Sequence, residues 1–152
     1  MAAGVMGLPW VFDDGGRAAA GYKGSTGDCV CRGIAIVTGL EYQTVYDLII
    51  EYAARERPSS RKARSHPRTG VHKATIRRIM ADLGWEWVPT MQIGSGTTVH
   101  VRPGELPESG RYLLNLSRHN CALVDGVIRD NHDPSRDGTR AVYGFWRLPD
   151  TP

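Results

Sequence analysis

Residues 27–39 constrain the fold most strongly, because they predict a buried helix that begins at a cysteine. A glycine-flanked loop leads to Cys29, and the residues that follow are almost all apolar, with Arg32 as the one charge. A helix without a polar face is usually buried, so we expect residues 29–38 to pack centrally against a sheet. Gly39 is expected to end this helix.

The first residue of this helix is a candidate nucleophile. The free amides and partial positive charge of a helix N-terminus favour the thiolate of Cys29, which is the reactive form. Asp28, the expected N-cap, stabilises the helix, but its charge opposes a second negative charge beside it. Catalysis therefore needs a histidine from elsewhere in the chain. The alternative is that Cys29 is a small buried hydrophobic residue.

The length and composition of the chain fit one globular domain. A chain of 152 residues with 41% hydrophobic content can bury a substantial core, so we expect a single domain over residues 1–152. Residues 1–10 lack the basic start and long apolar run of a signal peptide, and no segment reads as a membrane span. We therefore expect a cytoplasmic protein without a membrane partner. Three cysteines predict reduced thiols rather than a disulfide framework.

The net charge of +3 hides a strong asymmetry. In residues 55–78, nine basic side chains stand against Glu56 alone, which gives this segment +8 and leaves −5 for the rest of the chain. Such a segment is either a solvated surface or a contact for nucleic acid or another acidic partner. We expect residues 55–71 to form a basic surface loop, with Arg77 and Arg78 as candidate binding residues on the helix that follows.

The first half of the chain predicts three helices after a short lead-in. Residues 8–12 read as a strand before a tight turn, so residues 1–28 are expected to form a loop or hairpin lead-in. A second helix begins near Glu41, with an apolar stripe at three- and four-residue spacing: Tyr42, Val45, Tyr46, Ile49 and Ala53. A third helix runs from about His72 to Leu83 and exposes Lys73, Arg77 and Arg78.

From Gly84 onward the pattern changes to strands. The candidates are residues 85–88, 98–102, 111–116, 119–124, 127–131 and 141–148. The chain is therefore predicted to be α+β, with a helical N-terminal half whose buried central helix packs on a C-terminal antiparallel sheet.

A predicted hairpin supplies the histidine that Cys29 needs. The pair Asp125-Gly126 lies between two apolar runs and is typical of a two-residue turn. Such a turn makes His119 and Asp130 diagonal neighbours on one face of the hairpin. A histidine held by a carboxylate is an oriented base. Asp133, directly before Pro134, is the second candidate for the orienting acid.

This order resembles the papain-like cysteine peptidases: a cysteine opening the central helix, then a histidine at a strand start and an acid on the next strand. The small bacterial and phage members are most similar, namely the NlpC- and CHAP-type cell-wall endopeptidases and the bacteriocin-processing peptidases. The resemblance implies a papain-like fold with Cys29 as nucleophile, His119 as general base and Asp130 as the orienting residue, and it implies no cofactor.

The resemblance has one departure at the oxyanion hole. Many papain-like enzymes have a glutamine six residues before the cysteine, and this chain has Lys23 there. Lys23, Ser25 or Thr26 is then the candidate donor to the oxyanion. The chain also resembles uncharacterised bacteriophage and prophage proteins, both in its overall pattern and in residues 84–91 and 133–140. This resemblance implies a viral protein in the host cytoplasm.

Three functions follow from these features. The first is a cysteine hydrolase with a Cys-His-Asp triad, acting on a peptide, a protein or a small amide. The second is a non-catalytic papain-like binding module that contacts nucleic acid or an acidic partner through residues 55–78. The third is a zinc site formed by Cys29, Cys31, Cys121 and a histidine, which the Cys29-x-Cys31 spacing disfavours, so we expect no metal. Cys31 and Cys121 are expected to be buried packing residues, with Cys121 on the face of His119.

Overall fold

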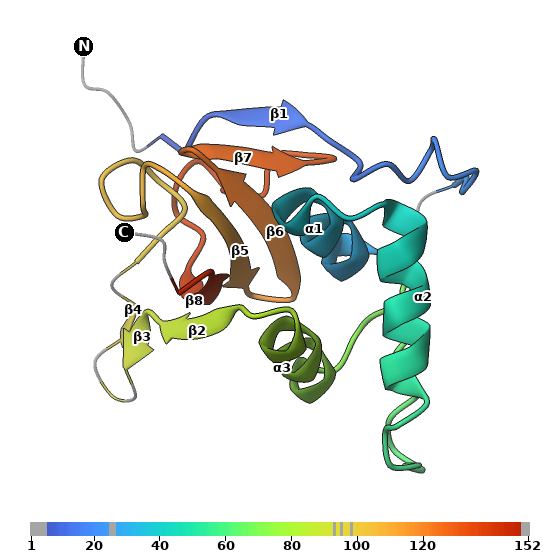
Figure 1. Ribbon diagram of the computed structural model, residues 1–152. Coiled ribbons are helices and arrows are strands. Elements are labelled where there is room, and N and C mark those ends of the chain that lie inside the picture. Colours follow the sequence, from blue (N-terminus) through green and yellow to red (C-terminus); the bar gives the residue numbers. More distant parts are fainter. Residues whose placement is uncertain (1–5, 25–26, 93, 95, 98, 150–152) are drawn as a thin grey trace.

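The computed structural model describes residues 6–24, 27–92, 94, 96–97 and 99–149. It has three helices and a six-stranded mixed sheet (Figure 1). The α+β class is therefore confirmed. In chain order the elements are β1 (Trp10–Phe12), α1 (Cys29–Thr38), α2 (Tyr42–Ala53), α3 (Lys73–Asp82), β2 (Glu86–Pro89), β3 (Met91–Gln92), β4 (Gly96–Thr97), β5 (Arg111–Leu116), β6 (His119–Val124), β7 (Val127–Asp130) and β8 (Val142–Arg147).

The strand order in the main sheet is β1-β7-β6-β5-β8-β2. Five of these strands pair antiparallel, but β1 runs parallel to β7, with Trp10 opposite Ile128 and Phe12 opposite Asp130. The prediction of an antiparallel C-terminal sheet is therefore wrong at this edge, and the lead-in strand pairs with β7 instead of within a local hairpin. Local periodicity cannot reveal this pairing, because its two partners lie more than a hundred residues apart.

One predicted strand, over residues 98–102, is not formed by the residues that the structure describes there. Of residues 98–102, Thr98 lies outside the described residues, and His100 makes a single bridge to Ala141 while its neighbours form no strand. Pro103 follows directly and has no N–H to donate to a ladder, which disfavours a strand here. The short pair β3 and β4 was not predicted, and it forms a separate two-stranded sheet.

Helix α1 has the predicted bounds and lies against β5 and β6 (Figure 1). Gly39 ends it in the left-handed conformation, with φ of 76°, and donates its N–H to Ala35. Gly33 faces the sheet, where an added Cβ would lie 2.6 Å from Leu113 Cδ1. The lack of a side chain at Gly33 therefore lets α1 approach the sheet closely, one turn after Cys29.

Both faces of the central strands β5 and β6 are buried. On one face, Leu113, Ala122 and Trp146 pack with the three helices. On the other face, Leu114, Cys121 and Leu123 pack beneath a loop that contributes Val101 and Leu106. The two-sided core explains why β5 and β6 are nearly continuous apolar runs rather than alternating ones.

The predicted β6–β7 hairpin is confirmed. Val124 pairs with Val127, and Leu123 pairs with Ile128. Asp125 and Gly126 both have positive φ, at 49° and 78°, as a two-residue turn of this kind requires. This register brings the start of β6 and the end of β7 to the same end of the sheet.

Candidate active site

Three predicted site residues meet at the end of the sheet where α1 begins. Cys29 is the first residue of α1, His119 is the first of β6, and Asp130 is the last of β7. His119 Nε2 lies 2.6 Å from Asp130 Oδ2. The His119 ring and the Cys29 thiol line the same pocket, and each shifts the pKa of the other. The imidazole is therefore held between a thiol and a carboxylate, and the predicted proximity of His119 and Asp130 is confirmed.

Asp130 is buried at 3% exposure and its carboxylate has several partners. Oδ2 faces His119, while Oδ1 accepts hydrogen bonds from the Arg32 guanidinium and the Asn131 N–H, each at 2.7 Å. Burial alone would raise the pKa of Asp130, but the hydrogen bond and charge of His119, the Asn131 N–H and Arg32 together lower it. Asp130 therefore stays ionised and holds His119.

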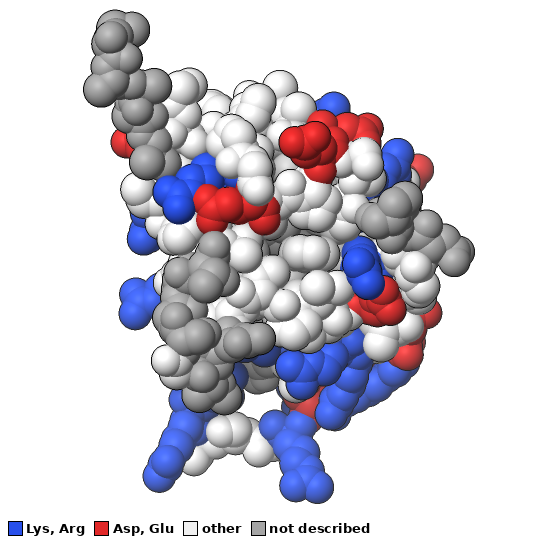
Figure 2. Space-filling model, turned by 90° about the vertical axis from the view of Figure 1, so that its left-hand side faces the viewer, with Lys and Arg blue, Asp and Glu red and all other residues white. Residues whose placement is uncertain are grey.

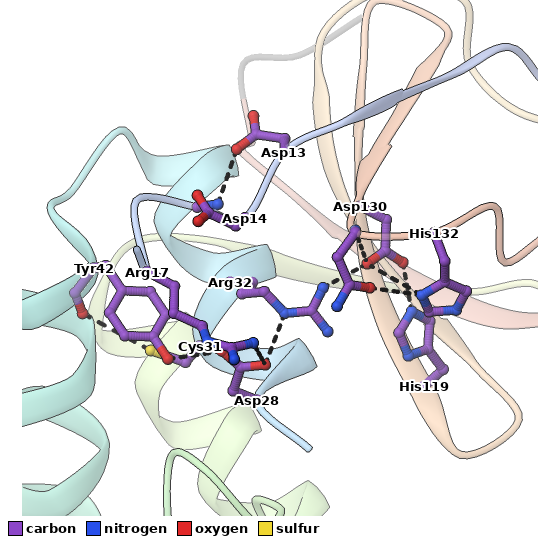
Figure 3. A network of polar contacts seen from close by, with 12 residues as sticks. Asp13, Asp14, Arg17, Asp28, Cys31, Arg32, Tyr42, His119, Asp130 and His132 are labelled. Carbon is purple, nitrogen blue, oxygen red and sulfur yellow. Dashed lines mark hydrogen bonds and ion pairs between the residues drawn. The ribbon is translucent and has the colours of Figure 1, made fainter. Parts of the chain in front are cut away.

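Arg32 connects this carboxylate to a second one (Figure 3). Its Nη1 lies 2.7 Å from Asp130 Oδ1, and its Nε lies 2.9 Å from Asp28 Oδ1. The Tyr42 hydroxyl donates to Asp28 Oδ2 at 2.7 Å. Arg32 is 4% exposed, so this is a buried chain of alternating charges. The sequence signal for it was the one charge in an otherwise apolar helix, which we did not interpret as part of the site.

The predicted capping bond of Asp28 is absent. Asp28 occupies the N-cap position of α1, but its side chain makes no hydrogen bond to the first-turn amides. The carboxylate turns instead toward Arg32, Tyr42 and, at 3.7 Å, Arg17. These partners outweigh local capping because they neutralise a fully buried charge. The amides at the start of α1 are thus left uncapped by this carboxylate.

The contacts shift the two proton-carrying groups in opposite directions. Burial lowers the pKa of His119, but the hydrogen bonds and charges of Asp130 and Cys29 raise it to about 9. Burial raises the pKa of the Cys29 thiol, but His119, the Asn120 N–H and Arg32 outweigh it and lower that pKa. Both shifts favour the thiolate–imidazolium pair over the neutral thiol and imidazole.

The other candidates from the sequence lie away from this contact. Asp133 is exposed and accepts a hydrogen bond from the Ser135 N–H at 3.0 Å, so Asp130 alone of the two holds His119. Lys23 is exposed, does not line the pocket that contains Cys29, and accepts a hydrogen bond from Arg68 at its carbonyl oxygen. Ser25 and Thr26 fall outside the described residues.

Cys31 and Cys121 are buried packing residues, as predicted. Cys31 donates to the Tyr42 carbonyl oxygen, and burial raises the pKa of its thiol to about 12. Cys121 lies in the core on the sheet face away from α1, and burial also raises the pKa of its thiol well above the ordinary value. Cys121 does not line the pocket that contains Cys29.

Within the described part of the chain, the three cysteines do not form a metal cluster. The group with metal-ligand geometry there is His119, Asp130 and His132, whose ligand atoms lie within 4.8 Å of one another. In this group His119 and Asp130 are already hydrogen-bonded, and the Arg32 cation lies against Asp130. A second positive charge at this carboxylate would be repelled by Arg32, so the donor set does not favour a metal ion.

A cleft leads away from Cys29 and His119. Its first part is bounded by the start of α3, the β5–β6 turn and Tyr143 of β8. Its second part shares Lys73, Ile76, Asn115, Asn120 and Tyr143 with the first and adds Arg77, Trp87 and Trp146. Arg77 therefore lines the cleft, whereas Arg78 does not. Sequence reasoning missed Asn120, Tyr143 and the two tryptophans.

The fold and the site together define an α+β protein with a Cys-His-Asp cluster at one end of its sheet, in which Asp130 is buried and Cys29 and His119 face a cleft. Comparison of the chain with protein-family models, with curated proteins and with solved structures gave no match. The function is therefore argued from the geometry and chemistry of the site itself.

Proposed function

We propose that the protein is a cysteine-dependent hydrolase of peptide or amide bonds, with Cys29 as its nucleophile. One observation carries the proposal: the His119 ring lines the same pocket as the Cys29 thiol, whose pKa it lowers, and lies 2.6 Å from the buried Asp130 carboxylate. A nucleophile, a base and a group that orients the base are the components of a catalytic triad.

In this reaction the Cys29 thiolate attacks the substrate carbonyl carbon, and the carbonyl electron pair moves onto oxygen. The tetrahedral intermediate collapses as His119 gives its proton to the departing amine, which leaves a thioester on Cys29. Water then attacks the thioester while His119 accepts its proton. Loss of the acid product returns the thiolate and the imidazolium.

The oxyanion needs hydrogen-bond donors close to Cys29. The first-turn amides of α1 have no intrahelical acceptor, and the Asp28 carboxylate does not bind them. These amides also lie at the positive end of the helix dipole. We therefore assign the oxyanion to the start of α1 rather than to Lys23.

The papain-like relationship also belongs to this proposal. The chain order Cys29, His119, Asp130 and the packing of α1 on the sheet support it. A bacteriophage protein acting in the host cytoplasm is the matching biological setting. Among the described residues, no helix has the length and apolar character needed to cross a membrane.

The pH dependence of alkylation tests the proposal. The protein is treated with iodoacetamide from pH 5 to 9, and modification at each cysteine is measured by mass spectrometry. We expect Cys29 to react rapidly near neutral pH, with an apparent pKa below the free thiol value of about 8.5, and to lose this reactivity in His119→Ala. Cys31 and Cys121 are internal controls, because both are buried with raised pKa values. Ordinary titration of Cys29, unchanged in His119→Ala, would reject the hydrolase.

A second function has its own supporting observation. The loop between α2 and α3 exposes Arg57, Arg61, Lys62 and Arg64, and Lys and Arg side chains gather at this end of the molecule in Figure 2. A non-catalytic binding module would use these cations on nucleic acid or another acidic partner. Its binding would weaken steeply with salt and would survive Cys29→Ala.

A further inference from the structure

The charge that lines the cleft beside Cys29 is of one sign. Lys73 and Arg77 from α3 and Arg118 from the β5–β6 turn line it. Among the described residues that line either part of the cleft, none is an Asp or a Glu. A cleft that holds cations without carboxylates attracts anionic groups.

Lys73 and Arg77 are available to a ligand. Both are exposed, and within the described residues neither has a hydrogen bond or an ion pair. They lie four residues apart on α3, where two positive charges repel each other across one helical turn. Their position therefore adds nothing to the stability of α3, but it places two cations along one wall of the cleft.

The second part of the cleft is lined by aromatic side chains. Trp87 and Trp146 lie with their ring centroids 5.0 Å apart, and Ile76 lies beside them. Gly144 makes room for this arrangement, because an added Cβ there would lie 2.3 Å from the Trp87 ring. A shift in the pairing of β5 with β8 leaves Tyr143 without a partner between Gly144 and Val142, so Tyr143 is a bulge residue that turns toward the cleft.

From these features we propose that the cleft selects peptides in which a large apolar side chain lies next to a carboxylate. The apolar side chain packs on Trp87 and Trp146, and the carboxylate binds Lys73 and Arg77. Cleavage of such a peptide rests on the proposed cysteine hydrolase, whereas its binding does not. The cleft would thus set which amide bond reaches Cys29.

A peptide fits these features better than a nucleic acid does. The cleft offers three cations around one apolar pocket rather than a continuous basic track along a phosphate backbone. Residues at its near end, Cys29 and His119, suit chemistry at an acyl carbon, which a nucleic acid backbone does not contain. Nucleic acid binding is therefore an outcome of the test and not part of the proposal.

Binding is measured on Cys29→Ala, so that turnover does not interfere. The probes are four acetylated, amidated tetrapeptides of sequence Gly-X-Z-Gly, in which X-Z is Phe-Glu, Phe-Gln, Ala-Glu or Phe-Lys. The readout is tryptophan fluorescence, since Trp87 and Trp146 line the cleft. We expect the Phe-Glu peptide to bind three- to tenfold more tightly than the Phe-Gln or Ala-Glu peptide, and the Phe-Lys peptide to bind most weakly.

The chain supplies a matched control for the charge. Arg77→Gln, made together with Lys73→Gln, should abolish the preference for Glu over Gln while the preference for Phe over Ala remains. Arg78→Gln removes one charge from the neighbouring position outside the cleft and should leave both preferences unchanged. Lys73→Glu with Arg77→Glu should reverse the order, so that the Phe-Lys peptide binds more tightly than the Phe-Glu peptide. Circular dichroism verifies that each variant is folded.

Three results would overturn the proposal. The first is equal binding, or no binding up to millimolar concentration, of the Phe-Glu and Phe-Gln peptides. The second is an equal effect of Arg77→Gln and Arg78→Gln. The third is tighter binding of a 20-nucleotide single strand that depends on Arg78 as much as on Arg77. Alkylation of Cys29 separately decides whether the hydrolase stands, so the two proposals fail independently.

Discussion

The start of α1 and the cleft-facing side of α3 use charge in opposite ways. At α1, Arg32 is buried between Asp28 and Asp130, and each charge has a partner within 3 Å. On α3, Lys73 and Arg77 are exposed and have no partner among the described residues. A buried charge must be paired for the chain to fold, whereas an exposed cation costs little without a partner. Substitutions of charged residues at the start of α1 should therefore lower stability, whereas substitutions of Lys73 or Arg77 should weaken ligand binding.

The largest effect is expected from Arg32→Met. This change leaves the buried carboxylates of Asp28 and Asp130 without their shared cation, and we expect the free energy of unfolding to fall by about 3–5 kcal/mol. Arg32 also lowers the pKa of Cys29, so the midpoint of Cys29 alkylation should move to higher pH. Urea unfolding and the alkylation profile measure the two effects.

Arg129→Met is the control for this variant. Arg129 is 42% exposed at its side chain and lies 3.6 Å from Asp13, so its ion pair belongs to the surface. We expect a change within about 1 kcal/mol and an unaltered alkylation profile. Equal losses of unfolding free energy in Arg32→Met and Arg129→Met would mean that burial does not determine how much the ion pairs of Arg32 contribute to stability.

A smaller loss is expected from Asp130→Ala. Arg32 keeps Asp28, but His119 loses its carboxylate, so stability should fall by about 2–3 kcal/mol and rapid alkylation of Cys29 should disappear. Asp133→Ala removes an exposed carboxylate three residues later and should leave alkylation unchanged. Slow alkylation in Asp133→Ala, with rapid alkylation in Asp130→Ala, would reverse our assignment of the orienting acid.

The third effect is a change in how stability depends on pH. The folded pKa of His119 is about 9 and its unfolded pKa is about 6.5, so its contribution is fully present below pH 6.5 and is lost as the pH rises toward 9. The lowered pKa of Cys29 acts in the opposite direction, because the folded protein has already released a proton that the unfolded chain keeps. In wild type the two contributions therefore have opposite signs.

Cys29→Ala removes one side of this balance. Asp130 still raises the pKa of His119 in this variant, although the contribution of Cys29 to that shift is lost. Above pH 6.5 the free energy of unfolding of Cys29→Ala should therefore fall more steeply than that of wild type, by about 1 kcal/mol, and this extra fall should end below pH 9. Adding His119→Gln should remove the extra slope. Urea unfolding at several pH values measures these curves, and parallel curves for wild type and Cys29→Ala would show that the thiol and the imidazole do not exchange a proton.

The sequence predicted those features of the fold that depend on residues close together in the chain. The bounds of α1, β5 and β6 and the register of the β6–β7 hairpin follow from periodicity and turn residues, which act over a few positions. The hairpin also brought His119 to Asp130, since a register fixes which side chains share a face. The proximity of Cys29 to His119 does not follow from any local pattern, because it depends on how α1 packs on the sheet.

The features that we missed are long-range. The parallel pairing of β1 with β7 and the second core on the far face of the sheet depend on segments distant in sequence. The capping prediction at Asp28 failed because Arg32 and Tyr42 compete for its carboxylate. The walls of the cleft come from α3, β2 and β8 and become visible only after the sheet is assembled.

The smallest effect comes from α3 itself, and it separates two adjacent arginines. Lys73 and Arg77 form a like-charge pair four residues apart, so Arg77→Gln should relieve repulsion and raise the free energy of unfolding by about 0.2–0.5 kcal/mol. Arg78 stands four residues before Asp82, so Arg78→Gln should instead lose a similar small amount. Urea midpoints at unchanged m-value can resolve this difference in sign. A gain for Arg77→Gln together with a loss of Glu selectivity would mean that this arginine serves the cleft at a small expense to the helix. A loss in both variants would mean that Arg77 supports the fold, and its charge would then not be placed for a ligand.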